Sequence, residues 1–153
     1  MRFTTILNDS TALKRKLYVA LIDDDEDDRQ FLAKAFQNIG SQHEFVEFED
    51  GEQFLDSLKQ ESQLRDVAKN CSLIILDVNM HRIGGFEVLQ IVKSNSALKH
   101  IPVIMLSTSI EGDQVQKAYK KGANSYLQKP HLMDDYNHLA VSIQTCFLQV
   151  PCV

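Results

Sequence analysis

The sequence predicts an α/β fold in which five parallel strands form one sheet with helices on both of its faces. Short apolar runs of strand length recur along the chain and alternate with segments whose apolar residues follow the helical period. The run that begins at Leu73 has no polar residue for four positions, as is typical of a strand buried on both faces. Strands that alternate with helices in this way indicate a doubly wound parallel sheet. The 153 residues suit one domain with a substantial core.

Five segments have the pattern of strands. They are residues 17–22, 44–48, 73–76, 103–106 and 123–128. The second segment is the most polar of the five, so we expect it near an edge of the sheet.

Five helices are expected to connect and follow these strands. Their apolar stripes lie around residues 31–39, 54–58, 86–92, 115–119 and 132–147. Gly40 and Gly122 are expected to end the first and the fourth of these helices. Across residues 59–70 the apolar phase slips, which we interpret as an irregular extension or a second short helix.

We expect the folded domain to cover residues 17–148. Residues 1–16 show no clear period and are interpreted as an N-terminal tail with a short helical turn at residues 11–14. Residues 149–153 are interpreted as a C-terminal tail.

The composition and net charge indicate which binding partners and which cellular compartment are expected for this protein. The net charge of −5 argues against nucleic acid or an anionic membrane as the main partner. No window approaches the roughly 20 apolar residues of a membrane span, and polar residues interrupt the N-terminus where a signal sequence would need an apolar core. The three cysteines form no closely spaced pair and their number is odd, which favours a reducing cytoplasm over a disulfide framework.

Chemically suggestive residues follow four of the five predicted strands. They are Asp23 and Asp24 after the first strand, Asp77 after the third, Ser107 after the fourth and Lys129 after the fifth. The carboxyl ends of parallel strands meet at one edge of a sheet, where open α/β sheets bind their ligands. Each of these residues alone would be an ordinary turn or surface residue, so the prediction of a site depends on their joint occurrence.

This set of side chains predicts a Mg²⁺-dependent phosphoryl acceptor. Three carboxylates in close proximity resist full ionisation unless a cation compensates them. Mg²⁺ takes oxygen ligands and is often shared between one or two carboxylates and a phosphate. An aspartate carboxylate can be the nucleophile that forms an aspartyl-phosphate. A lysine ammonium and a serine hydroxyl can hold the phosphoryl oxygens, and such positioning and charge neutralisation do most of the work in phosphoryl transfer.

Residues 17–148 resemble the receiver domain of the response regulators of two-component systems. The motifs that carry the resemblance are Ile22-Asp23-Asp24-Asp25, Leu76-Asp77-Val78-Asn79-Met80, Gly85, Pro102 to Ser107, and Lys129-Pro130. The resemblance implies a flavodoxin-like, doubly wound (βα)5 fold with strand order 2-1-3-4-5. In that order the first and third strands are neighbours, which would bring Asp23 and Asp24 to Asp77.

The resemblance also implies an acceptor and a set of metal ligands. Asp77 is expected to be the phosphoacceptor. Asp24 is expected to bind Mg²⁺ directly, with Asp23 assisting through water and Asn79 supplying its backbone carbonyl. Mn²⁺ is an expected substitute for Mg²⁺.

Further roles are implied for residues that respond to the phosphoryl group. Ser107 is expected to be a switch hydroxyl and Tyr126 a switch aromatic that turns inward on activation. Lys129 is expected to pair with a phosphoryl oxygen, and Pro130 to follow a cis peptide bond that helps place this lysine. Gly85 is expected to have a structural role in the loop after Asp77.

Some residues of these motifs are expected to have other roles or depart from the family pattern. Asp25 is expected to cap the following helix, and the acids up to Asp28 to lie in its first turn, where the helix dipole favours negative charge. His81 stands where the family often has proline and Gly84 where aspartate is common, so the loop is expected to differ in flexibility. We expect no ligand role for His81, because oxygen ligands suit Mg²⁺.

The expected function is that of a stand-alone response regulator. A sensor histidine kinase or a histidine phosphotransfer protein would supply the phosphoryl group. The chain ends soon after the last predicted helix, so we expect no output domain and a downstream protein partner instead, bound by a monomer or weak homodimer. Such a chain is not an enzyme beyond catalysing its own phosphorylation and dephosphorylation.

Three other functions are weighed against this one. The first is a phosphorylation-independent scaffold on the same fold. The second is a phosphohydrolase of the haloacid-dehalogenase type, which would need a second acid two residues after the nucleophile, where this chain has Asn79. The third is a flavodoxin-like cofactor binder, which the acidic residues after the first strand disfavour because they would repel a phosphate.

Overall fold

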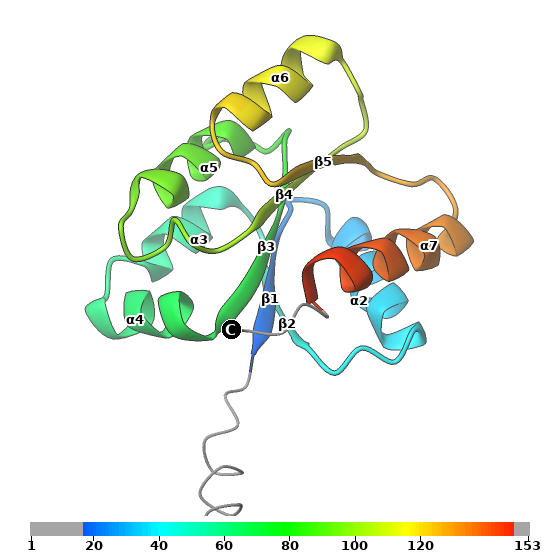
Figure 1. The fold of residues 1–153 in the computed structure, drawn as a ribbon, viewed down its shortest axis with the longest axis horizontal. Coiled ribbons are helices and arrows are strands. Elements are labelled where there is room, and N and C mark those ends of the chain that lie inside the picture. The colour runs from blue at the N-terminus through cyan, green and yellow to red at the C-terminus, as the bar shows by residue number, and fades with distance from the viewer. Residues whose placement is uncertain (1–16, 149–153) are drawn as a thin grey trace, which may run out of the picture.

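A five-stranded parallel sheet with helices on both faces forms the centre of the molecule (Figure 1). The computed structural model describes residues 17–148. The strands lie in the order β2-β1-β3-β4-β5, and all neighbouring pairs are parallel. Their bounds are Tyr18–Ile22 for β1, Glu44–Phe48 for β2, Cys71–Asp77 for β3, Val103–Ser107 for β4 and Ser125–Gln128 for β5.

Two groups of helices cover the two faces of the sheet (Figure 1). One face carries α3 (Gly51–Ser57), α4 (Glu61–Asn70), α5 (Gly85–Ser94) and α6 (Gly112–Lys120). The other face carries α2 (Glu26–Asn38) and α7 (Met133–Ile143), which pack against each other, and a π-helical turn over Gln144–Leu148 continues α7.

The apolar runs of the central strands divide between the two cores. Along β3, Ile74 and Leu76 face α3 to α6, whereas Leu73 and Ile75 face α2 and α7. Successive side chains of a strand point to opposite faces, so covering both faces buries every residue of the run. This arrangement explains why the sequence shows a continuous apolar run at this strand. The predicted strand order and helix coverage are thus confirmed.

The edge position predicted for residues 44–48 is confirmed. β2 pairs only with β1 among the described strands, and its residues are exposed or partly exposed. Residues 59–70 contain a regular helix, α4, of which only Val67 is fully buried. This shallow packing explains why its sequence lacks a continuous apolar stripe.

Two strands, β3 and β5, begin two residues away from their predicted starts. β3 begins at Cys71 because Cys71 pairs with Tyr18, and the β1–β3 register then shifts before Val19. β5 begins at Ser125 rather than at residue 123, because Asn124 is used in the preceding turn. The Asn124 amide donates to the carbonyl of Val103 at 2.8 Å, and the Asn124 side-chain oxygen accepts from the Val103 amide at 2.9 Å.

The structure does not describe the two predicted tails, and it bears on the expectation about membrane spans only for residues 17–148. The helical turn expected at residues 11–14 and both expected tails fall outside residues 17–148. Within that described range, no helix has the length and apolar character needed to cross a membrane.

Candidate functional site

Three aspartates meet at the carboxyl ends of β1 and β3. Asp23 and Asp24 follow β1, and Asp77 is the last residue of the neighbouring β3. One carboxylate oxygen from each of the three lies within 4.8 Å of the others. Asp23 and Asp77 are buried, whereas Asp24 is partly exposed. The sheet order therefore brings together the three acids that the sequence predicts as metal ligands.

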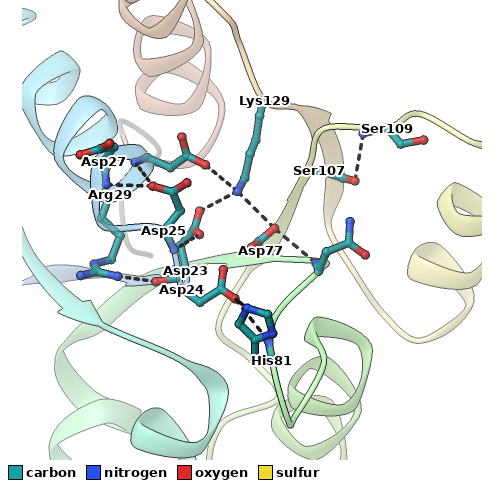
Figure 2. A network of polar contacts seen from close by, with 12 residues as sticks. Asp23, Asp24, Asp25, Asp27, Arg29, Asp77, His81, Ser107, Ser109 and Lys129 are labelled. Atoms are coloured by element: carbon teal, nitrogen blue, oxygen red, sulfur yellow. Dashed lines mark hydrogen bonds and ion pairs between the residues drawn. The ribbon is translucent and has the colours of Figure 1, made fainter.

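Lys129 extends from the end of β5 into this cluster (Figure 2). Its ammonium Nζ lies 2.8 Å from Oδ2 of Asp23, 2.9 Å from Oδ2 of Asp28 and 3.3 Å from Oδ1 of Asp77. The side chain is 8% exposed, so these contacts form largely out of water. At the backbone, the Lys129 amide donates to the carbonyl of Ser107 at 2.7 Å, which fixes where the side chain begins.

The cis peptide bond expected before Pro130 is wrong for this structure. No peptide bond in residues 17–148 is cis. The trans form of a bond before proline is favoured by about 0.5–1 kcal/mol, and with this form Lys129 already contacts Asp23 and Asp77. The placement of the lysine therefore does not require the cis form here.

The pKa values at the site reflect burial together with an excess of negative charge. Burial raises the pKa of Asp77 to about 7, the charge of Asp23 adds to this rise, and Lys129 opposes it. Burial also raises the pKa of Asp23, against the hydrogen bonds from Lys129 and the Asp25 amide. Burial by itself would lower the pKa of Lys129, but its hydrogen bond with Asp23 and the charges around it raise the pKa above its ordinary value. Lys129 thus offsets only part of the rise in the pKa of Asp77 that burial and the charge of Asp23 cause.

A glycine is required where α5 approaches the end of β3. A Cβ atom on Gly85 would lie 2.2 Å from the backbone oxygen of Asp77 and 2.9 Å from Cα of Val78. The Gly85 amide donates to the Val78 carbonyl at 3.1 Å. The start of α5 therefore packs directly on the backbone that carries Asp77.

Ser107 and Tyr126 are connected through Ser109. Ser107 is fully buried at the end of β4, and its hydroxyl oxygen accepts a hydrogen bond from the Ser109 amide at 3.2 Å. Tyr126 is buried with its ring turned into the protein, and its hydroxyl donates to the Ser109 carbonyl at 3.1 Å. Two predicted switch residues thus hold the same loop residue. Asn79 donates its amide to Oδ1 of Asp77 at 3.3 Å, which places its backbone beside the acid cluster.

Comparison with known proteins decides the family. A family model described as the response regulator receiver domain matches residues 19–140. The chain belongs to this family. Its five-stranded sheet in the order β2-β1-β3-β4-β5 is the flavodoxin-like, doubly wound fold of receiver domains.

Individual relatives of the receiver domain are similar along most of their length. Response regulator Rcp1 of Synechocystis sp. is 29% identical over 131 residues, which cover 86% of this chain and 88% of Rcp1. Two-component response regulator ARR17 of Arabidopsis thaliana is 30% identical over 141 residues, which cover 89% of this chain and 90% of ARR17.

Solved structures show the same similarity in three dimensions. The phosphorylated cyanobacterial phytochrome response regulator RcpA superposes with a TM-score of 0.78 at 31% identity, covering 89% of this chain and 96% of RcpA. The Mn²⁺-bound form of Rcp1 superposes with a TM-score of 0.76 at 27% identity, covering 90% of this chain and 98% of Rcp1.

The loop after Asp77 in this receiver domain is held by contacts of two adjacent residues, His81 and Arg82. The His81 amide donates to Oδ2 of Asp24 at 3.3 Å, and the His81 ring is 94% exposed with Nε2 3.6 Å from the same oxygen. Arg82 has a left-handed φ of 64° and pairs with Glu52 of α3 at 2.8 Å. The exposed ring shows that His81 is placed at the mouth of the site rather than within it.

The acids at the start of α2 have different roles in the structure. Asp25 is the N-cap, as predicted, and its Oδ1 accepts from the amides of Asp27 and Asp28 at 2.9 and 3.2 Å. Asp28, however, was expected only as a first-turn acid, and its side chain reaches the site. Its Oδ2 contacts Lys129, and its Oδ1 accepts from the hydroxyl of Tyr136 at 3.3 Å.

A sequence signal for Asp28 exists in its spacing. Asp28 precedes the buried Leu32 by four residues, so both lie on the same face of α2, the face turned toward α7. Nothing in the local sequence indicates that a lysine 101 residues away would meet it there.

Proposed function

We propose that this receiver domain is a response regulator that accepts a phosphoryl group on Asp77. The observation that carries the proposal is the position of the Asp77 carboxylate, which is buried between two further aspartates and 3.3 Å from the Lys129 ammonium. This combination suits an acceptor that gains negative charge, because the Lys129 ammonium lies beside Asp77 and the two neighbouring aspartates could hold a cation that would offset the charge of the phosphoryl oxygens.

The transfer itself uses the Asp77 carboxylate as nucleophile. One carboxylate oxygen attacks the phosphorus atom, a P–O bond forms, and the bond from phosphorus to the donor breaks with its electron pair leaving on the donor group. The donor is a phosphohistidine, or acetyl phosphate in a test reaction. Lys129 then donates from its ammonium to a phosphoryl oxygen, and Ser107 donates its hydroxyl to another.

The acid cluster, made of Asp23, Asp24 and Asp77, fits a divalent cation. These residues together offer three carboxylate oxygens within 4.8 Å of one another. Burial is the main cause of the raised pKa values of Asp23 and Asp77, and a nearby cation would favour their charged forms. We propose that these residues, with the backbone carbonyl of Asn79, hold Mg²⁺. The cation would supply charge neutralisation between the acceptor and the incoming phosphoryl oxygens, and Mn²⁺, which the Rcp1 structure contains, would substitute.

The output of phosphorylation is proposed to travel through Ser109. When Ser107 turns its hydroxyl to the phosphoryl group, the hydrogen bond from the Ser109 amide to Ser107 has to change, and Tyr126 is bound to the carbonyl of the same residue. A phosphoryl group shifts a two-state equilibrium only by its differential contacts with the two states, and this loop carries such contacts. The responding face is that of α6, β5 and α7.

The proposed partners follow from this chemistry. A sensor histidine kinase or histidine phosphotransfer protein in the cytoplasm donates the phosphoryl group, and a downstream protein binds the responding face. The receiver domain catalyses only its own phosphorylation and dephosphorylation, and acts as a monomer or weak homodimer. The net charge of −5 disfavours nucleic acid and anionic membrane as partners.

Intact-mass measurement after incubation with acetyl phosphate tests the proposal. The expected result is one phosphoryl adduct that requires Mg²⁺ and is absent from Asp77→Asn. A matched control is Asp27→Asn, which removes an exposed carboxylate outside the cluster and should be phosphorylated as the wild type is. An adduct of equal yield in Asp77→Asn would place the acceptor elsewhere. If neither an adduct nor Mg²⁺ binding by NMR titration occurs, the chain is a phosphorylation-independent scaffold.

A further inference from the structure

The ammonium of Lys129 has one carboxylate partner outside the group of three aspartates, Asp23, Asp24 and Asp77, that could hold a cation. An ammonium has three N–H donors, and three carboxylates lie within 3.3 Å of Nζ, those of Asp23, Asp28 and Asp77. Asp23 and Asp77 belong to the group of acids that could hold a cation, whereas Asp28 does not. A cation in that group would draw oxygens of Asp23 and Asp77 away from Lys129 and leave Asp28 as its partner.

The position of Asp28 is itself fixed from two sides. Its backbone lies in the first turn of α2, where the amide is bound by the N-cap Asp25 at 3.2 Å. The other carboxylate oxygen of Asp28, Oδ1, accepts a hydrogen bond from the hydroxyl of Tyr136 in α7 at 3.3 Å. The helices α2 and α7 pack against each other, and Leu32 of α2 and Tyr136 of α7 belong to the same core. Asp28 therefore presents Oδ2 to Lys129 from a rigid support.

The geometry points to Asp28 as a positioning residue, fixed by Tyr136, that holds the Lys129 ammonium beside Asp77 while the other carboxylates bind the cation. This inference rests on the proposed function, since the lysine is placed for phosphoryl transfer. Without Asp28, a four-carbon side chain with several rotatable bonds would have no lasting partner once Asp23 and Asp77 are engaged. Misplacement of a charge-stabilising group by about 1 Å can cost a large factor in rate.

The negative charge of Asp28 is expected to slow phosphorylation, whereas its positioning of Lys129 is expected to speed it. The experiment has to separate these two effects. A carboxylate near the site repels an anionic phosphoryl donor, so removing its charge alone would speed the reaction. Asp28→Asn removes the charge and the charge-assisted hydrogen bond together. Tyr136→Phe keeps the charge and removes only the hydroxyl that orients Asp28. Asp27→Asn removes one charge from the same helical turn, at an exposed position, and is the matched control.

The first readout is the rate of phosphorylation by acetyl phosphate at saturating Mg²⁺. We expect Asp28→Asn to be about tenfold slower than the wild type and Tyr136→Phe about threefold slower, with Asp27→Asn within about twofold. The Mg²⁺ dissociation constant, measured by NMR titration, should remain within about twofold of the Asp27→Asn value, since Asp28 is not among the predicted ligands.

The second readout is the ¹H–¹⁵N NMR signal of the Lys129 ammonium, which is observable only while the group is ordered and protected from water. It is assigned by its loss in Lys129→Arg. We expect the signal in the Mg²⁺-bound wild type and in Asp27→Asn, weakened in Tyr136→Phe and absent in Asp28→Asn. This readout does not depend on phosphorylation, so it tests the positioning of Lys129 even if the wild type accepts no phosphoryl group and the proposed function fails.

Two results would overturn the inference. One is an Asp28→Asn protein that is phosphorylated as fast as the wild type or faster and keeps the Lys129 signal. The other is a Tyr136→Phe protein that matches the wild type in both readouts while Asp28→Asn phosphorylates faster, which would leave Asp28 with a charge effect only.

Discussion

The hydroxyl of Tyr126 donates a hydrogen bond to the backbone carbonyl of Ser109, 3.1 Å away. Ser109 lies two residues beyond Ser107, whose hydroxyl oxygen accepts from the Ser109 amide. The buried Tyr126 of β5 thus binds the same residue, Ser109, that donates its amide to Ser107 at the end of β4. This connection is a physical link between Ser107, at the end of β4, and Tyr126 of β5.

Tyr126→Phe should weaken that link without impairing the acceptor. The hydroxyl contacts Ser109 and Gln114, both outside the acid cluster, so the rate of phosphorylation should stay within about twofold of wild type. Loss of the hydrogen bond should lower the coupling free energy by about 1 kcal/mol. NMR shifts of α6 amides on adding beryllofluoride, a phosphoryl mimic, should become smaller. Tyr18→Phe, which removes a hydroxyl bound to the remote Asp66, is the control, and a full response in Tyr126→Phe would contradict the link.

The metal-free protein should lose stability as the pH rises toward neutrality. The pKa of Asp77 is raised to about 7 in the folded state, above its ordinary value of 3.8. The folded protein therefore binds this proton more tightly than the unfolded chain does, and the resulting stabilisation is fully present below pH 3.8 and is lost as the pH rises through about 7. Urea unfolding in EDTA at several pH values between 5 and 8 measures this slope.

Asp77→Asn provides the control for the pH dependence. Asparagine is uncharged throughout this range, so the variant should show a smaller decrease in the free energy of unfolding between pH 5 and pH 8. It should also be more stable than the wild type at pH 8 without metal. Equal slopes in the two proteins would mean that Asp77 does not carry the effect.

Mg²⁺ should stabilise the folded protein through the three aspartates. A ligand at 100 times its dissociation constant raises the free energy of unfolding by about 2.7 kcal/mol when it binds only the folded state. Asp24→Asn should abolish most of this gain, because Asp24 is the proposed direct ligand and the most exposed of the three aspartates, so its substitution disturbs the buried part of the site least. Thermal unfolding with and without Mg²⁺ measures the effect. Asp27→Asn should respond as the wild type does, and a full Mg²⁺ response in Asp24→Asn would exclude it as a ligand.

Gly85→Ala should destabilise the protein, and the neighbouring Gly84→Ala should not. An added Cβ at Gly85 would meet the Asp77 backbone oxygen at 2.2 Å, whereas one at Gly84 would meet nothing within 4 Å. Gly84 also has a φ of −74°, which alanine adopts freely. We expect a loss of about 2–4 kcal/mol for Gly85→Ala and a change within about 0.5 kcal/mol for Gly84→Ala. Urea unfolding of both variants provides the measurement, and equal stabilities would show that α5 can shift away from Asp77.

The local pattern of the chain was sufficient to predict the strands and the helices that cover both faces of the sheet. The run from Leu73 to Leu76 predicts a strand covered on both faces, and a strand of that kind needs helices on both sides of the sheet. Asp25 was predictable as a helix cap because capping is a bond between residues two and three positions apart. The clustering of Asp23, Asp24 and Asp77 followed from the resemblance to receiver domains, which supplied the strand order.

Other features could be decided only in three dimensions. The sequence could not choose between an irregular segment and a helix at residues 59–70, because α4 buries only Val67 and so imposes little pattern on its residues. The bond before Pro130 is trans in the structure, and the small energy difference between the two isomers of such a bond gives the local sequence little power to predict which one occurs.

The sequence by itself determined the sheet, its covering helices and the residue types that line its carboxyl edge, because these depend on local periodicity and on the chain order of the strands. The tertiary structure alone decided that Asp28 shares Lys129 with the cluster and binds Tyr136 of α7. The contacts join residues 101 and 108 positions apart in the chain, where no local propensity links them. They exist because α2 and α7 pack on the same face of the sheet and bring the partly buried Asp28 to Lys129, which follows the edge strand β5.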